Sequence, residues 1–126
     1  MGKRILLVED DADNRRIFET VLRREGYDVT SVVDGVEAIE RLATLRPDLV
    51  VVDLGLPRLD GWQTVRRMRS TEGLQSVPVI AVTALALQGD EERARSAGCD
   101  DYLAKPCPPA RLREKVKEWI SRGSDL

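Results

Sequence analysis

The chain contains no histidine among its 126 residues. This absence excludes nucleophile systems that pair serine or cysteine with histidine, and it excludes ordinary zinc sites. Only two cysteines are present, Cys99 and Cys107, and their spacing matches no metal-binding motif. A disulfide between them is not expected in a reducing compartment. Any chemistry that needs an imidazole must therefore take it from another molecule.

An excess of one charge and long apolar runs are also absent. The net charge is -2, which argues against a protein held on nucleic acid by phosphate attraction. There is no leading apolar segment of the signal type and no run of about 18 apolar residues, so the sequence predicts neither export nor membrane insertion. We expect a cytoplasmic protein in which residues 1–126 form one globular domain.

Short apolar segments alternate with helical patterns five times along the chain. Because Val, Ile and Leu follow one another without polar alternation, these segments are typical of strands that are covered on both faces of a parallel sheet. The pattern predicts a three-layer α/β fold with five strands and five helices. The expected strands are Arg4–Val8, Asp28–Val32, Asp48–Asp53, Val77–Thr83 and Asp101–Ala104.

Three helical segments carry specific expectations. In the first, Ile17, Phe18, Val21 and Leu22 form one apolar stripe. The fourth, residues 88–97, has no large apolar residue and offers only alanines to the sheet, so we expect it to be the least anchored helix. The last begins near Pro109, and residues 121–126 are expected to form a short tail.

The predicted strands deliver polar side chains at the points where they end. Glu9 and Asp10 follow the first strand, Asp53 ends the third, Thr83 ends the fourth and Lys105 follows the fifth. Because the carboxyl ends of parallel strands meet at one edge of a sheet, we expect these groups to lie close together.

Clustered acids repel one another unless a cation shares them, and Mg²⁺ prefers hard oxygen ligands. The sequence predicts a Mg²⁺ site with Asp10 and Asp53 as direct ligands. Glu9 is expected to bind the ion through a water molecule, and a backbone carbonyl near Gly55 to complete the set of protein ligands.

Asp53 is the expected nucleophile, because an aspartate is ionised at neutral pH and needs no general base. Lys105 and the cation would neutralise the oxygens of a phosphoryl group during attack. The hydroxyl of Thr83 would donate a hydrogen bond to the group after transfer. The product would be an acyl phosphate on Asp53.

These residues, in this order, resemble the receiver domain of two-component response regulators, the CheY-like family. The matching stretches are Val8-Glu9-Asp10-Asp11, Asp53-Leu54-Gly55-Leu56-Pro57 with Asp60-Gly61, Thr83-Ala84, Lys105-Pro106 and Gly98-Cys99-Asp100-Asp101-Tyr102. The resemblance covers essentially the whole chain. It implies a flavodoxin-like sheet in the order 2-1-3-4-5 and a cis peptide bond before Pro106.

The resemblance also implies a function. A histidine kinase or a histidine phosphotransfer protein would donate a phosphoryl group to Asp53 in a Mg²⁺-dependent reaction. Thr83 and Tyr102 would then switch the face made by the fourth helix, the last strand and the last helix, where a downstream protein binds. Such a chain is a phosphoacceptor switch that catalyses only its own phosphorylation and dephosphorylation. It is expected to be a monomer or a weak, phosphorylation-linked dimer.

Two positions depart from the family pattern. Gly55 and Leu85 stand where larger or polar side chains are common, beside the route of the hydrolytic water. These departures leave the lifetime of the phosphorylated state open.

Three other functions remain as alternatives. A phosphohydrolase with an aspartyl-phosphate intermediate usually has a second acid two residues after the nucleophile, where this chain has Gly55. A flavin- or nucleotide-binding module would need a phosphate loop after the first strand, where acids would repel phosphate. An interaction module that has lost phosphorylation would not need the intact set of site residues.

Overall fold

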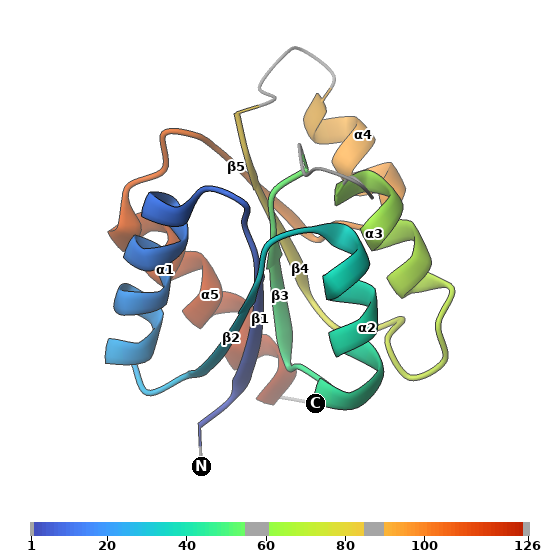
Figure 1. The fold of residues 1–126 in the computed structure, drawn as a ribbon, viewed down its shortest axis with the longest axis horizontal. Helices are drawn as coiled ribbons and strands as arrows, with labels where there is room; N and C mark the ends of the chain where they lie inside the picture. Colours follow the sequence, from blue (N-terminus) through green and yellow to red (C-terminus); the bar gives the residue numbers. More distant parts are fainter. Residues whose placement is uncertain (1, 55–60, 85–89, 125–126) are drawn as a thin grey trace.

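The computed structural model describes residues 2–54, 61–84 and 90–124. Strands and helices alternate strictly along the chain (Figure 1). The elements are β1 (Arg4–Val8), α1 (Ala12–Arg24), β2 (Asp28–Val32), α2 (Gly35–Leu45), β3 (Leu49–Val52), α3 (Gly61–Arg69), β4 (Val79–Thr83), α4 (Asp90–Ala97), β5 (Asp101–Ala104) and α5 (Pro109–Ser124).

The five strands form one parallel sheet in the order β2-β1-β3-β4-β5. Helices α1 and α5 cover one face of the sheet, and α2, α3 and α4 cover the other (Figure 1). This arrangement confirms the flavodoxin-like, three-layer fold that the sequence predicts. The cis peptide bond between Lys105 and Pro106 is present as well.

Strands β1, β2 and β5 have the bounds that the sequence predicts, whereas β4 is shorter at its start and β3 is shorter by one residue at each end, so that Asp53 lies just beyond it. β4 begins at Val79 instead of Val77 because Pro78 has no amide hydrogen, and the Val77 amide closes a turn to the Leu74 carbonyl. β3 begins at Leu49, and Asp48 instead pairs its carboxylate with the backbone amide of Arg4 at 2.8 Å.

The core consists of two apolar clusters, one on each face of the sheet. Alternate residues of the strands point to opposite faces, so Leu6 and Val8 pack under α2, α3 and α4, whereas Ile5 and Leu7 pack under α1 and α5. All residues of β3 and β4 are buried. Rigid, fully covered strands at the centre of the sheet hold the residues at their ends in fixed positions.

The stripe expected on α1 is only partly correct. Phe18 and Leu22 are buried, but Ile17 is 46% exposed. Ile17 lies at the edge of the stripe, where it lines a groove with Pro109, the first residue of α5, instead of the core. Helix α1 ends before Gly26, whose φ of 89° is the left-handed conformation expected there.

Helix α4 faces the sheet with the two alanines that the sequence predicts. Of its described side chains, those that are buried belong to Ala94 and Ala97. Because hydrophobic stabilisation scales with the apolar area removed from water, two alanines contribute little. The first residues of the expected helix, 88 and 89, lie outside the described residues.

Helix α5 extends farther than the sequence predicts, since it continues to Ser124 where a tail was expected from residue 121. The Arg122 side chain accounts for the extra turn. Its guanidinium lies 4.2 Å from the centre of the Trp119 ring and donates a hydrogen bond to the Glu118 carboxylate one turn earlier.

No helix within the described residues is long and apolar enough to cross a membrane. Both cysteines carry free thiols. Burial raises the pKa of Cys99 to about 12, so this thiol stays protonated and unreactive at neutral pH.

Candidate functional site

Backbone hydrogen bonds continue past the ends of the strands and fix the site residues in place. The amide of Glu9 donates to the Val32 carbonyl, the amide of Asp53 to the Val8 carbonyl and the amide of Lys105 to the Thr83 carbonyl. Each of these residues is therefore held by the neighbouring strand, although it lies just outside its own strand. The three side chains start from rigid positions at the same edge of the sheet.

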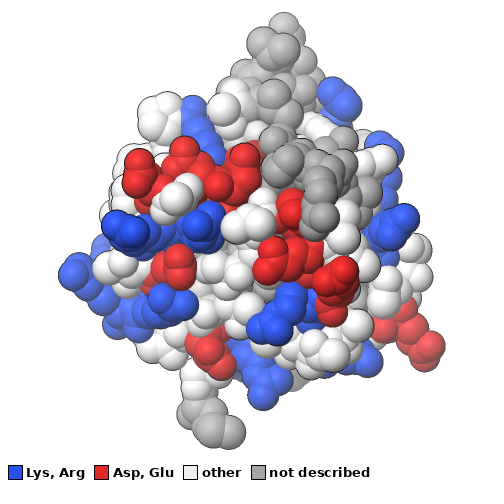
Figure 2. Space-filling view, in the orientation of Figure 1, with Lys and Arg blue, Asp and Glu red and all other residues white. Residues whose placement is uncertain are grey.

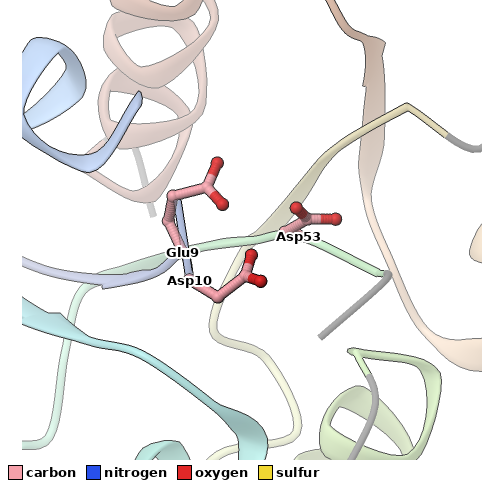
Figure 3. Close-up of side chains that lie close together, drawn as sticks. All are labelled: Glu9, Asp10 and Asp53. Carbon is pink, nitrogen blue, oxygen red and sulfur yellow. The ribbon is translucent and has the colours of Figure 1, made fainter. Parts of the chain in front are cut away.

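Three carboxylates meet at this edge. One oxygen from each of Glu9, Asp10 and Asp53 lies within 4.8 Å of the others. Figure 3 shows Glu9 and Asp10 at the end of β1 and Asp53 at the end of β3, with the Asp10 carboxylate directed toward Asp53. Glu9 is buried, Asp53 is half-buried and Asp10 is exposed. The cluster thus reaches from the interior to the surface.

Lys105 neutralises two of these acids. Its Nζ atom donates to Glu9 Oε1 at 2.6 Å and to Asp53 Oδ2 at 2.9 Å. Burial lowers the pKa of Lys105, but the hydrogen bonds and charges of Glu9 and Asp53 outweigh it, so the pKa lies above its usual value. The ammonium is charged at every physiological pH.

Glu9 has the most unusual environment of the site, because its side chain is only 2% exposed. Burial raises its pKa to about 7, against the opposing effect of Lys105. The sequence predicts that Glu9 acts through water, and in the structure its carboxylate contacts Lys105 directly. Its second oxygen accepts the Asp11 amide at 3.3 Å.

Arg15 is a site residue that sequence reasoning did not assign to this role. Its guanidinium donates to the backbone carbonyl of Glu9 at 3.1 Å and to that of Asp10 at 3.4 Å. Asp11 caps the start of α1 by accepting the Asn14 amide. Together these contacts brace the turn that presents the acidic pair.

Thr83 and Tyr102 lie on the neighbouring strands. Thr83 ends β4 and is 1% exposed, and it stands opposite Ala104 in the register of β4 with β5. Tyr102 is half-buried and packs against the cluster under α2, α3 and α4. The remaining predicted positions, Gly55 and Leu85, lie outside the described residues.

The residues present fit a small divalent cation. Carboxylate oxygens are the donors that Mg²⁺ prefers, and Mg²⁺ binds proteins through one or two carboxylates while it keeps several waters. Asp10 and Asp53 offer such a pair, since both are more exposed than the buried Glu9. An ionised carboxylate beside a cation site and a fixed ammonium can take up an electrophilic phosphoryl group.

Comparisons with known proteins agree with this geometry. Residues 5–117 match the family model of the response regulator receiver domain. The polar-differentiation response regulator DivK of Brucella anthropi is 36% identical over 120 residues, which cover 95% of this chain and 98% of that protein.

Solved structures agree as well. The receiver domain of a sensor histidine kinase from Pseudomonas aeruginosa PAO1, which has a magnesium ion coordinated in its active-site cleft, is 45% identical with a TM-score of 0.88. The match covers 96% of this chain and 99% of that one. A CheY-like receiver domain from Methanospirillum hungatei is 27% identical with a TM-score of 0.92, covering 99% of this chain and 98% of that one. The chain therefore belongs to the response regulator receiver domain family and is a receiver domain of two-component signal transduction.

Proposed function

We propose that Asp53 is the phosphoacceptor and takes its phosphoryl group from a phosphohistidine on a histidine kinase or a phosphotransfer protein. One observation carries the proposal. The Lys105 ammonium contacts the half-buried Asp53 within a three-carboxylate cluster, which is the combination of carboxylates and a fixed positive charge that phosphoryl transfer with Mg²⁺ needs.

In the proposed reaction, an Asp53 carboxylate oxygen attacks the phosphorus atom of the phosphohistidine. A new oxygen–phosphorus bond forms as the nitrogen–phosphorus bond breaks, and the bonding pair leaves with the imidazole, which takes up a proton. The product is an acyl phosphate, which water later cleaves to inorganic phosphate and the free carboxylate. The Asp53 carboxylate is regenerated in each cycle, so the chain acts as a reversible switch.

The protein's own residues divide the work of this step. Lys105 offsets negative charge as two anions approach, because its ammonium can turn from the Asp53 carboxylate to a phosphoryl oxygen. Asp10 and Asp53 would hold Mg²⁺, which supplies a second positive charge to the phosphoryl oxygens when it is bound. Glu9 holds Lys105 in place from its buried side.

Signalling follows from the position of Thr83 and Tyr102. The Thr83 hydroxyl would hydrogen-bond the new phosphoryl group, and the space that it leaves would let the Tyr102 ring move inward. The face of α4, β5 and α5 then presents a different surface to a downstream protein. A Thr83→Ala variant should still be phosphorylated but should show no change in the ring environment of Tyr102 by NMR; an unaltered change would contradict this role.

A groove along α1 suits the docking of the phosphodonor. Its volume is about 360 Å³, and it is lined by Arg16, Ile17, Thr20, Val21, Arg24 and Pro109. Ile17 and Val21 give the groove an apolar surface, and Arg16 and Arg24 lie at the two ends of its α1 side. Figure 2 shows Lys and Arg residues beside the acidic edge of the molecule, in the region of α1. The groove therefore fits an amphipathic helix with acidic side chains, seated beside Asp53.

The docking proposal predicts different effects on a phosphoprotein donor and on a small-molecule donor. Arg16→Glu and Ile17→Ser should slow transfer from a cognate phosphoprotein at least about tenfold, because each removes about 1.4 kcal/mol or more of docking energy. Transfer from phosphoramidate, which needs no docking, should be unchanged. Arg66→Glu, an exposed position on α3, serves as the control. Equal slowing with both donors would place the defect in the site instead of the groove.

The phosphoacceptor is tested by intact mass. With Mg²⁺ and phosphoramidate or acetyl phosphate, the protein should gain one phosphoryl group that is stable in acid and labile in base. Asp53→Asn should gain none, whereas Asp13→Asn, on an exposed acid of α1, should behave as the parent. Rapid turnover of phosphomonoesters without a stable gain would indicate a phosphohydrolase instead.

A further inference from the structure

Helix α3 begins directly against the backbone of the proposed phosphoacceptor. The amide of Gly61 donates to the Leu54 carbonyl at 3.1 Å. A Cβ atom on Gly61 would stand 2.4 Å from the Asp53 carbonyl oxygen and 2.4 Å from the Leu54 Cα atom. No side chain fits there, so the first turn of α3 is held against the Asp53 backbone, and a movement of one displaces the other.

Trp62, the next residue, connects this first turn to α4. Its ring is 9% exposed and belongs to the cluster under α2, α3 and α4. The Arg93 guanidinium of α4 lies 4.7 Å from the centre of the Trp62 ring, which is within the range of a cation–π contact. Among the described side chains of α4 the buried ones are those of two alanines, so this stacked pair adds a substantial contact to the helix.

The other end of α4 is fixed much more firmly. Arg69 of α3 donates to the Gly98 carbonyl from Nε at 2.9 Å and from its second terminal nitrogen at 2.7 Å, and to the Asp100 carboxylate at 2.8 Å. The same guanidinium also binds the carbonyls of Leu74, Gln75 and Val77. Gly98 has a φ of 116°, and a Cβ there would lie 2.6 Å from Arg69 Cγ. The residues that follow α4 are thus clamped to α3 and to the start of β4.

We propose that α4 pivots about this clamp and that the Arg93–Trp62 contact holds it in its resting position. The inference rests on the proposed phosphorylation of Asp53. When phosphorylation displaces the Asp53 backbone, Gly61 and therefore Trp62 are displaced with it. The contact between Trp62 and Arg93 is then broken, and α4 moves to the conformation that partners bind. This route runs through α3 and is separate from the one through Thr83 and Tyr102. Arg93 is a positioning residue, since it acts on α4 and does not touch the phosphoryl group.

The contact can be tested before any phosphorylation. Arg93→Ala should raise hydrogen exchange of the α4 amides about two- to fivefold, which corresponds to the loss of an exposed cation–π contact. Arg93→Lys, which keeps a cation over the ring, should restore most of the protection. Ser96→Ala, on an exposed position of the same helix, is the matched control. Equal exchange in parent and Arg93→Ala would overturn the proposal that this contact holds α4.

The coupling to Asp53 is tested with the indole N–H resonances of the ¹⁵N-labelled protein. Trp119→Phe identifies which of the two tryptophan signals belongs to Trp62. Addition of Mg²⁺ and phosphoramidate should shift the Trp62 resonance in the parent and leave it unshifted in Asp53→Asn. In Arg93→Ala the Trp62 resonance should still shift, because Trp62 precedes Arg93 on the route, but the backbone amide resonances of α4 should shift much less than in the parent.

Mass spectrometry of the same samples separates the two possible failures. If the protein gains a phosphoryl group and the Trp62 resonance does not move, or the α4 amide resonances shift equally in the parent and in Arg93→Ala, the route through α3 is refuted while the proposed function stands. If no phosphoryl group is gained, the proposed function fails, and the hydrogen exchange experiment alone decides whether Arg93 positions α4.

Discussion

Replacing Lys105 with methionine removes the ammonium that contacts both Glu9 and Asp53 but keeps the aliphatic stem. The side chains of Lys105, Glu9 and Asp53 are 15%, 2% and 11% exposed, so the interaction is largely shielded from water. In the variant, two neighbouring carboxylates lose the cation that offsets them. Without a metal ion, we expect the free energy of unfolding to fall.

The size of this loss follows from the environment of the acids. Removing one partner of a buried ion pair costs about 3–5 kcal/mol. Part of that cost is relieved because Glu9, whose pKa is already raised to about 7, can take up a proton. We therefore expect a loss of about 2–3 kcal/mol at pH 8. The loss should be smaller at pH 6, because this pH lies below the raised pKa of Glu9 in the folded protein.

Magnesium should offset part of this loss of stability. Two unit charges about 4 Å apart interact by about 4 kcal/mol at an effective dielectric constant of 20, so removing a like charge from beside the cation site favours binding. We expect Lys105→Met to bind Mg²⁺ at least about tenfold more tightly. Saturating Mg²⁺ should then stabilise the variant more than the parent, by about 1.4 kcal/mol for each tenfold gain in affinity.

Urea denaturation at pH 6 and pH 8, in EDTA and in Mg²⁺, measures all of these quantities. Lys117→Met, on an exposed position of α5, controls for the change of residue type. If Lys105→Met were as stable as the parent in EDTA and bound Mg²⁺ with the same affinity, Lys105 would not be neutralising the cluster, and the reasoning about the site would be refuted.

Three further predictions concern the stability of single-residue variants outside the carboxylate cluster. Gly61→Ala should destabilise the protein by about 1–3 kcal/mol in thermal unfolding, because its Cβ would meet backbone atoms at 2.4 Å, and a change near zero would show that α3 does not press on that backbone. Asp101→Asn should cost about 1–2 kcal/mol at pH 7, because the Trp119 indole and the Lys115 ammonium both donate to its carboxylate. Burial raises the pKa of Asp101, but these hydrogen bonds and that of the Tyr102 amide outweigh burial, so the pKa lies below its usual value. The difference in stability between variant and parent should therefore shrink as the pH falls below about 4. Leu112→Ala should cost about 2–5 kcal/mol in urea denaturation, because the Leu112 side chain of α5 is completely buried in the apolar cluster between the sheet, α1 and α5.

Much of the fold could be predicted because short Val-, Ile- and Leu-rich runs that alternate with helical patterns are typical of buried parallel strands. The site could be predicted for a related reason. In a parallel sheet all carboxyl ends lie at one edge, so Asp10, Asp53 and Lys105 had to converge once the strands were identified. The structure brings these three together as expected.

Side-chain contacts across the sheet could not be predicted, because sequence spacing gives no distance between residues far apart in the chain. The direct pairing of Glu9 with Lys105 is one example. The folding back of Arg15 onto two carbonyls is another, and its only signal in the sequence is an arginine close after the acidic pair. Periodicity also misplaced Ile17, because a residue at the edge of an apolar stripe is buried only if a neighbouring helix covers it.

The most direct test of the account is to locate the phosphoryl group on the chain. Reduction of the phosphorylated protein with borohydride converts an acyl phosphate to the corresponding alcohol, and peptide mass spectrometry then identifies the modified residue. The account predicts homoserine at position 53 in samples treated with Mg²⁺ and phosphoramidate, and none when Mg²⁺ is withheld. Homoserine at Asp10 or another acid, with Asp53 unchanged, would contradict it.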